Sequence, residues 1–297
     1  MAVSYIPTYH NLSVTPQGLG TFKINYVEAG SPDLPTVLLL HGFPSSSTQF
    51  RDFIPLLSDD YHVFAPDLPG FGLTEPPKDL KYTFDNLAKA ISAWLVALNV
   101  TSYAVYMFDY GAPVAQRLAL ENPEQVKAII TQNGNAYDIG FGHPFWSPIE
   151  ALWQSNNSAE DREWLRDNYL TIAGTKMQYV TGVPKEDRAL VNPAAWTTDY
   201  LMNVAGKENE EHQLDLFFDY RNNKVMYPKV HEYFRKSQVP LLAVWGKNDP
   251  VFEHAEAYKQ DLPNAEVRLL DTGHFALETK RWEIARIMVD FLKKVEF

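Results

Sequence analysis

The sequence predicts an α/β protein with a mostly parallel sheet, helices on both faces of that sheet, and a helical segment inserted into it. Three observations support this prediction. Apolar segments of strand length alternate with helical segments in the first part of the chain, the alternation returns near the end, and the stretch between the two parts lacks it. Alternating strands and helices are typical of a parallel sheet covered by helices.

The first alternating part runs from about residue 20 to about residue 135. Residues 36–40 form a continuous apolar run, as in a strand buried on both faces. Residues 84–98 repeat apolar side chains at helical spacing, which predicts an amphipathic helix. The other elements expected here are strands at 22–27, 61–65, 103–107 and 126–131 and helices at 48–57 and 112–120.

The rhythm resumes near the end of the chain, where we expect strands at 240–245 and 266–270 and helices at 254–261 and 280–292. Residues 136–236 show helical patches without a clear buried strand, and they hold four of the 7 Trp residues. We therefore expect one α/β core, formed by residues 1–135 and 237–297, with residues 136–236 inserted as a helical cap.

Composition limits the classes of function. The net charge of −11 disfavours nucleic acid and anionic lipid as partners. Cysteine is absent, which excludes disulfides, thiolate metal sites and a cysteine nucleophile. No apolar run approaches the ~20 residues of a membrane span, and the first seven residues lack the basic flank and apolar stretch of a signal peptide. We expect a cytoplasmic protein with no membrane partner, and its oligomeric state is left open.

The segment Met107-Phe108-Asp109-Tyr110-Gly111 lies between an expected strand and an expected helix. It resembles the nucleophile elbow of the α/β-hydrolase family, G-x-S-x-G, with Met107 at the first small position and Asp109 at the nucleophile position. Aspartate occupies that position in the epoxide hydrolase and haloalkane dehalogenase branches of the family. An Asp after a strand is by itself more typical of a helix N-cap, so the catalytic interpretation depends on the motifs that accompany it.

The partners that the resemblance implies occur in the order of the family, nucleophile, acid, then histidine. His274 corresponds to the base that activates water, and Asp249 to the acid that orients its imidazole. The backbone N–H groups of Phe43 and Tyr110 correspond to the oxyanion hole, because His41-Gly42-Phe43-Pro44 resembles the H-G-x-P motif of epoxide hydrolases. Residues 67–74 resemble the family loop that follows the next strand.

Carboxylate chemistry explains the choice of nucleophile. A serine attacks an acyl carbon, whereas a carboxylate displaces a leaving group from an sp3 carbon and becomes an alkyl ester. Water then cleaves that ester with help from a general base and an oxyanion hole. This chemistry needs no cofactor. The histidines lack metal-ligand spacing, so no metal is expected, and His41 is interpreted as support for its own loop.

The leaving group needs N–H or O–H donors, which we expect on the cap. Phe217-Phe218-Asp219-Tyr220-Arg221-Asn222-Asn223 resembles the segment that carries a donor tyrosine in epoxide hydrolases and in fluoroacetate dehalogenases, and Tyr220 matches that tyrosine. The other donor tyrosine of epoxide hydrolases should lie near residues 149–154, which contain no tyrosine. Trp153 is the nearest N–H donor there.

The leading interpretation is an epoxide hydrolase that produces a vicinal diol from an apolar or aromatic substrate and water. The alternative is a haloalkane dehalogenase, although Tyr110 stands where many of these enzymes have Trp and Phe43 where some have Asn. A third interpretation is a non-catalytic binding protein on a hydrolase scaffold, because a fold does not fix a function. The complete set of nucleophile, acid and histidine argues against it.

Overall fold

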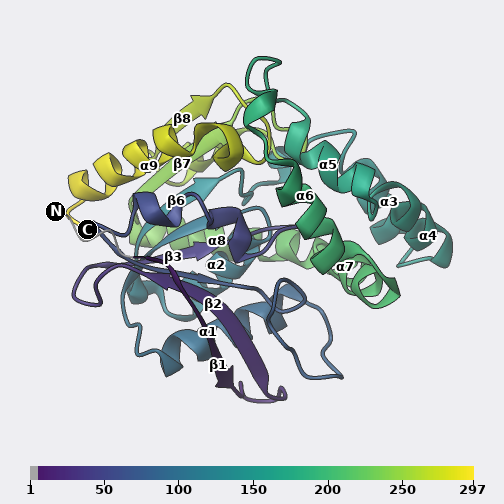
Figure 1. Cartoon of the computed structure of the whole chain (residues 1–297), viewed down its shortest axis with the longest axis horizontal. Coiled ribbons are helices and arrows are strands. Elements are labelled where there is room, and N and C mark those ends of the chain that lie inside the picture. Colours follow the sequence, from purple (N-terminus) through teal and green to yellow (C-terminus); the bar gives the residue numbers. More distant parts are fainter. Residues whose placement is uncertain (1–5) are drawn as a thin grey trace.

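The computed structural model describes residues 6–297 and contains one eight-stranded sheet with strand order β1-β2-β4-β3-β5-β6-β7-β8 (Figure 1). Pairing is antiparallel between β1 and β2 and between β2 and β4, and parallel from β4 through β8. The predicted α/β class is thus confirmed. We expected no signal peptide in the first seven residues, and five of these, residues 1–5, lie outside the described part of the chain. The strands are Thr8–Val14 (β1), Phe22–Ala29 (β2), Thr36–Leu40 (β3), His62–Pro66 (β4), Tyr103–Phe108 (β5), Val126–Gln132 (β6), Leu241–Gly246 (β7) and Glu266–Leu270 (β8).

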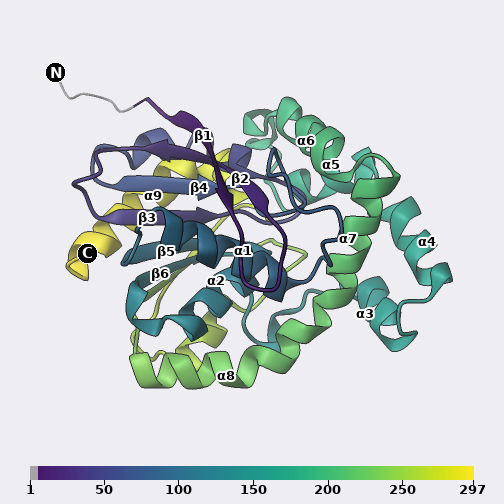
Figure 2. The same ribbon diagram turned by 90° about the horizontal axis from the view of Figure 1, so that it is seen from below.

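Successive side chains of a strand point to opposite faces of its sheet, and β5 shows how both faces are covered. Tyr103, Val105 and Met107 join one hydrophobic cluster, and the residues between them join a second cluster. The first cluster contains side chains from α1 (Phe84–Ala97), α2 (Gly111–Glu121) and α8 (Arg221–Ser237). The second contains side chains from α9 (Ala276–Lys294), which lies on the opposite face of the sheet (Figure 2).

The chain between β6 and β7 forms helices α3 to α8. In both views, α3 to α7 lie together at one end of the sheet, and α8 returns from that end to pack beside α2 (Figures 1 and 2). The bounds of this group are Ser147–Gln154 (α3), Ala159–Asn168 (α4), Ile172–Val180 (α5), Pro193–Asp199 (α6) and Lys207–Asp219 (α7), with a π-helical turn at Tyr200–Val204. We refer to residues 136–236 as the cap segment.

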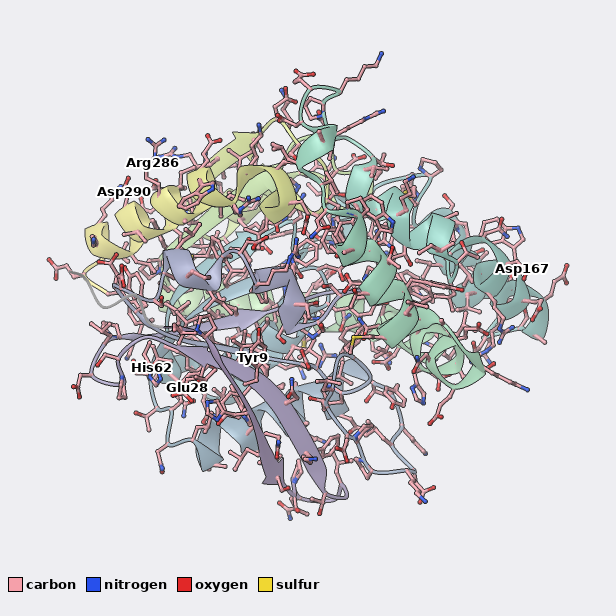
Figure 3. The ribbon with its side chains drawn as sticks, in the orientation of Figure 1. Tyr9, Glu28, His62, Asp167, Arg286 and Asp290 are labelled. Carbon is pink, nitrogen blue, oxygen red and sulfur yellow. The ribbon has the colours of Figure 1, made fainter. Side chains whose placement is uncertain are left out.

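Charged side chains tie two helices of the cap segment together. Arg162 on α4 donates to Asp215 on α7 at 3.0 Å, and Arg166 donates to Glu210 at 3.0 Å. Asp167, at the outer end of α4, marks the edge of the cap segment farthest from β1 (Figure 3). The cap segment is therefore braced internally as well as against the sheet.

Three elements differ from the sequence-based expectation. The strand β1 was not expected, because it is an edge strand whose side chains are mostly exposed and show no apolar alternation. The helix expected at 48–57 is two short 3-10 turns, Ser47–Phe50 and Ile54–Leu56, and Pro55 in the second lacks the N–H that a continuous helix needs. The helix expected at 254–261 is a 3-10 turn, Ala255–Gln260.

No helix within residues 6–297 combines the length and the hydrophobicity that crossing a bilayer requires. Over the same residues, no group of three or more His, Asp or Glu side chains is arranged to hold a metal ion. Glu28 on β2 and His62 on β4 lie 2.8 Å apart, between the Glu28 carboxylate and His62 Nε2, and join the two strands (Figure 3).

Candidate active site

Asp109 occupies a sharp turn between β5 and α2. Its φ of 45° lies in the left-handed region, which few residues other than Gly adopt and which Asp tolerates better than most. A side chain at Gly111 would lie 2.3 Å from the Leu40 carbonyl oxygen, so α2 can begin this close to β3 only with glycine. Met107 is 1% exposed within the first hydrophobic cluster, and the turn thus accommodates this bulky departure from the elbow pattern.

The loop after β3 brings backbone N–H groups to the Asp109 carboxylate. Phe43 N donates to Asp109 Oδ1 at 2.7 Å, and the backbone N–H of Tyr110, the next residue, also lowers the pKa of this carboxyl. A Cβ at Gly42 would lie 2.4 Å from Asp109 Oδ1, so only glycine permits this approach. The structure thus brings the two predicted oxyanion-hole residues to the predicted nucleophile.

Burial controls the protonation of Asp109, which is 4% exposed. Loss of water raises the pKa of its carboxyl to about 6, against the opposing effects of His274 and of the N–H groups of Phe43 and Tyr110. The carboxylate is therefore ionised at neutral pH but poorly solvated. A desolvated anion of this kind is a reactive nucleophile.

Asp249 lies in the loop after β7 and His274 in the loop after β8, and the two side chains meet next to Asp109. His274 Nδ1 lies 2.8 Å from Asp249 Oδ2, and His274 Nε2 lies 3.9 Å from Asp109 Oδ2. Val251 N donates to Asp249 Oδ1 at 2.7 Å and fixes this carboxylate. In the neutral imidazole with its proton on Nδ1, facing Asp249, the lone pair of Nε2 faces Asp109.

The charges around His274 favour its protonated form. Burial by itself would lower the pKa of this fully buried imidazole. The Asp249 carboxylate, through its charge and its hydrogen bond, and the Asp109 carboxylate, through its charge, together outweigh burial and raise the pKa of His274. An imidazolium at this position is stabilised by the two carboxylates that lie near it, Asp249 and Asp109.

The last residue of β6, Gln132, and the residue after it, Asn133, support this arrangement and were not predicted. Asn133 donates to Asp249 Oδ2 at 2.7 Å and accepts from Gly246 N at 2.9 Å, with a positive φ of 49°. Gln132 donates to the His274 carbonyl oxygen at 2.9 Å. The signal was present as a polar run, Thr131-Gln132-Asn133-Gly134-Asn135, at the carboxyl end of a buried strand.

His41 has the supporting role that the sequence predicted. Its Nε2 accepts a hydrogen bond from Leu68 N at 2.9 Å, which joins the loop after β3 to the loop after β4. Burial lowers the pKa of this imidazole to about 4, so it stays neutral and remains an acceptor at neutral pH.

Tyr220 lies between α7 and α8 and is fully buried. Its hydroxyl has no hydrogen-bond partner within residues 6–297. Burial, with contributions from Tyr227 and the Asp109 carboxylate, raises its pKa well above 10, so it is a protonated donor near the nucleophile.

The structure corrects the prediction for Trp153. Its indole N–H donates to the Phe217 carbonyl oxygen at 2.7 Å and is thus committed to joining α3 to α7. Trp146, whose ring lies 4.6 Å from that of Tyr220, donates to the Val251 carbonyl oxygen at 2.8 Å. Neither indole is free to bind a leaving group.

Aromatic rings cluster around the turn that carries Asp109. Phe43 lies 5.8 Å from Tyr110 and 5.1 Å from Phe217, and Phe252 lies 6.2 Å from His274, between ring centroids. Such a lining favours an apolar or aromatic group over a hydrated one.

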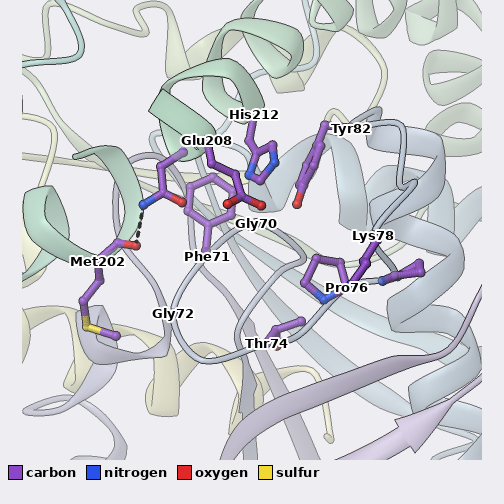
Figure 4. A pocket seen from close by; sticks show the side chains of 12 residues that line it. Gly70, Phe71, Gly72, Thr74, Pro76, Lys78, Tyr82, Met202, Glu208 and His212 are labelled. Carbon is purple, nitrogen blue, oxygen red and sulfur yellow. Dashed lines mark hydrogen bonds between the residues drawn. The ribbon is translucent and has the colours of Figure 1, made fainter. Parts of the chain in front are cut away.

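A surface cavity of about 300 Å³ opens beside this region, between the loop after β4 and the start of α7 (Figure 4). His212 stacks on Tyr82 at one wall, with ring centroids 3.9 Å apart. Phe71 lines the cavity and also contacts Tyr110, with centroids 6.3 Å apart. The Phe71 ring therefore separates the open cavity from the elbow.

Comparisons with known proteins identify the family of this chain. Residues 35–281 match the family model described as alpha/beta hydrolase fold. An uncharacterised hydrolase of Saccharomyces cerevisiae, YNR064C, is 45% identical over 272 residues, which cover 90% of this chain and 92% of that protein. A haloalkane dehalogenase of Psychrobacter cryohalolentis is 22% identical, over 95% of this chain and 91% of that protein.

Among solved structures, haloalkane dehalogenase DbeA of Bradyrhizobium elkani superposes with a TM-score of 0.78 at 22% identity, covering 98% of this chain and 99% of that one. This similarity shows a shared fold. The chain is therefore a hydrolase of the α/β-hydrolase family, with haloalkane dehalogenases among its relatives.

Proposed function

We propose that this hydrolase opens epoxides through a covalent ester on Asp109 and releases a vicinal diol. The observation that carries the proposal is a carboxylate, in place of a hydroxyl, at an elbow that also has backbone donors and a histidine–aspartate pair. Phe43 N lies 2.7 Å from Asp109 Oδ1, and His274 Nε2 lies 3.9 Å from Asp109 Oδ2.

In the first step, Asp109 Oδ2 attacks the less hindered epoxide carbon. The carbon–oxygen bond breaks, and its electron pair moves to the epoxide oxygen, to which the Tyr220 hydroxyl donates. The hydrogen bond from Phe43 N holds Oδ1 and so orients the attacking oxygen. The product is an alkyl ester on Asp109.

In the second step, His274 takes a proton from water, and the resulting hydroxide attacks the ester carbon of Asp109. Negative charge develops on the carbonyl oxygen, where the N–H groups of Phe43 and Tyr110 stabilise it. Collapse of this intermediate releases the diol. Asp249, held by Asn133 and Val251, keeps the imidazole in place throughout.

The proposed substrate is a small neutral epoxide with an apolar or aromatic substituent, because aromatic rings cluster around the turn that carries Asp109. The only other reactant is water, and the steps above require no cofactor.

Isotope transfer tests the covalent route. In a single turnover in H2(18)O, the diol oxygen comes from Asp109, and we expect the label in the Asp109 carboxylate, read by mass spectrometry of its peptide. A label found directly in the diol, with none in Asp109, would show that water attacks the epoxide itself.

Removal of the base should separate the two steps. His274→Ala should still form the ester but hydrolyse it about 10²- to 10⁴-fold more slowly, as expected for loss of a general base. The measurement is a mass increase on the Asp109 peptide equal to the epoxide. His254→Ala, at a histidine whose side chain is 57% exposed, is the control and should show no lasting adduct.

A haloalkane dehalogenase is the second candidate, because a relative covering 95% of this chain carries that name. The same attack by Asp109 would then release a halide. Halide release from a panel of chloro- and bromoalkanes, measured beside diol formation from matched epoxides, decides between the two activities.

A further inference from the structure

Two hydroxyls near the nucleophile are buried without a partner. Tyr110 is 2% exposed and Tyr220 is fully buried. Neither hydroxyl has a hydrogen-bond partner in the described part of the chain, residues 6–297, and the same is true of His274 Nε2. Buried polar groups are nearly always paired in folded proteins, because leaving one unpaired costs free energy. Such groups at one site indicate hydrogen bonds that a ligand completes.

The two tyrosines are neighbours. Their ring centroids lie 5.9 Å apart, and both rings stand edge-on against Phe84, at 4.9 Å for Tyr110 and 5.4 Å for Tyr220. Tyr110 follows the nucleophile directly, whereas Tyr220 comes from the junction of α7 and α8. The two hydroxyls thus reach the same region from the core and from the cap segment.

The indoles around Tyr220 are already engaged. The Trp153 and Trp146 indoles donate to backbone carbonyls. The Tyr227 hydroxyl accepts from Asn135 Nδ2 at 3.4 Å, whereas the hydroxyls of Tyr110 and Tyr220 neither donate nor accept within residues 6–297.

We propose that Tyr110 is a catalytic residue whose side-chain hydroxyl, together with that of Tyr220, donates to the oxygen that leaves the reacting carbon. The inference rests on the proposed epoxide opening. It gives Tyr110 two roles, because its backbone N–H belongs to the proposed oxyanion hole while its side chain acts on the leaving group.

The proton balance of this step closes. As the ester bond to Asp109 forms, the epoxide carbon–oxygen bond breaks, and the oxygen that receives the electron pair takes a proton from one tyrosine and a hydrogen bond from the other. In the second step, the proton that His274 removed from water passes to the tyrosinate and restores the neutral tyrosine. The proton on the newly hydrolysed Asp109 carboxyl passes to the departing diol oxygen.

Burial and nearby carboxylates keep both phenols protonated until they are needed. Burial first, and then Asp109 and Asp219, raise the pKa of Tyr110 well above 10. An alkoxide is a stronger base than a phenolate, so proton transfer becomes favourable only as the carbon–oxygen bond breaks. Two donors also suit an oxygen with two lone pairs better than a halide, which needs no proton.

The test is the rate of ester formation on Asp109 in single turnovers with styrene oxide and 1,2-epoxyhexane, in the wild type and in Tyr110→Phe. Phenylalanine keeps the ring and the backbone N–H, so ester hydrolysis should stay within about threefold while ester formation falls about 10²-fold, as for loss of a general acid. Tyr220→Phe should behave similarly, and the double variant should form no measurable ester.

Tyr233→Phe is the matched control. Tyr233 also carries a buried hydroxyl without a partner among residues 6–297, but it lies on α8 beside Phe234, away from the nucleophile. Its loss should leave both rate constants unchanged. A fluorinated tyrosine at position 110 keeps the hydroxyl and lowers its pKa, and it should change the rate of ester formation without changing the melting temperature.

The outcomes separate the two proposals. If wild type forms the Asp109 ester and Tyr110→Phe forms it equally fast, the role of Tyr110 is wrong and the epoxide hydrolase proposal stands. If wild type turns the epoxides over without forming the ester, the proposed mechanism itself is wrong. An equal loss of ester formation in Tyr233→Phe would also overturn the specific role of Tyr110.

Discussion

At the scale of single residues, Asp109 shows a conflict between stability and reactivity. Its carboxylate is 4% exposed, and burial raises its pKa from 3.8 to about 6. A carboxyl whose pKa is higher in the folded state than in the unfolded state weakens the folded state at every pH above its unfolded pKa. In the proposed mechanism, the same burial that makes the Asp109 carboxylate reactive thus destabilises the fold.

Asp109→Asn should therefore stabilise the protein at neutral pH. The rise of the pKa from 3.8 to about 6 corresponds to an upper limit of about 3 kcal/mol. Asn also tolerates the left-handed φ of 45°. Urea unfolding at pH 7.5 should show the gain, and the gain should shrink as the pH falls through 6 toward 4. A gain that is independent of pH would contradict this explanation.

The two chemical steps should differ in pH dependence. Ester formation needs ionised Asp109 and should fall below about pH 6. Esterification then removes one of the charges that raise the pKa of His274, so this pKa should be lower in the alkyl-enzyme than in the free protein. Stopped-flow pH profiles of the separate steps measure both values. An unchanged histidine pKa after esterification would count against the arrangement.

The motif order predicted Asp109, Asp249 and His274 correctly as neighbours, since a turn after a strand requires particular residues that can be read in sequence. The sequence could not reveal which hydroxyls are left unpaired. Trp153 was expected as a donor from its position along the chain. Its N–H instead donates to the Phe217 carbonyl oxygen on another helix, a contact between distant segments that the sequence does not reveal.

At the scale of elements, the junction between α7 and α8 positions Tyr220. Asp219, the last residue of α7, accepts a hydrogen bond at 2.8 Å from Phe84 N, at the start of α1. Arg117 on α2 donates to Asn223 on α8 at 2.8 Å. Both bonds anchor the junction to helices that also pack on the sheet, so the cap donor is held relative to the nucleophile.

Asp219→Ala removes one of these anchors. We expect the free energy of unfolding to fall by about 1 kcal/mol, the usual effect of losing an N-cap partner, and ester formation to slow because Tyr220 is less well placed. Glu232, whose side chain is 56% exposed, offers a control, since Glu232→Ala on α8 should change stability much less than Asp219→Ala does. Denaturant unfolding and single-turnover rates provide the measurements. Unchanged ester formation in a destabilised Asp219→Ala would show that the anchor does not position Tyr220.

Trp153→Phe tests the corrected role of that residue. Loss of the hydrogen bond to Phe217 should cost about 1 kcal/mol of stability, while the rate of ester formation should stay within about threefold of wild type. A much larger loss of rate without a loss of stability would restore Trp153 as a leaving-group donor.

Strands were the elements best predicted from sequence, because β3, β5 and β6 are buried runs whose composition alone identifies them. Edge strand β1 and the 3-10 turns near Ser47 and Ala255 were not recognised. Their conformations depend on pairing with β2 and on local capping by Ser46, which leave a weak sequence pattern.

At the scale of the whole molecule, the net charge of −11 acts on every approaching ligand. A neutral epoxide experiences little of this field, whereas a carboxylate-bearing epoxide is repelled at low ionic strength. Between about 20 and 500 mM salt, kcat/KM should stay within about twofold for the neutral substrate and rise for the anionic analogue as salt screens the repulsion. A strong salt dependence for the neutral substrate would be inconsistent with this expectation.

The unpaired hydroxyls of Tyr110 and Tyr220 also link ligand occupancy to folding. An unreactive carbonyl compound that accepts both hydrogen bonds binds the folded chain alone, and at about 100 times its Kd it should add about 2.7 kcal/mol to stability. Melting temperature then becomes a readout of molecular recognition that needs no turnover. A thermal screen of oxygen-containing compounds can thus define which shapes the closed site accepts before any substrate is known.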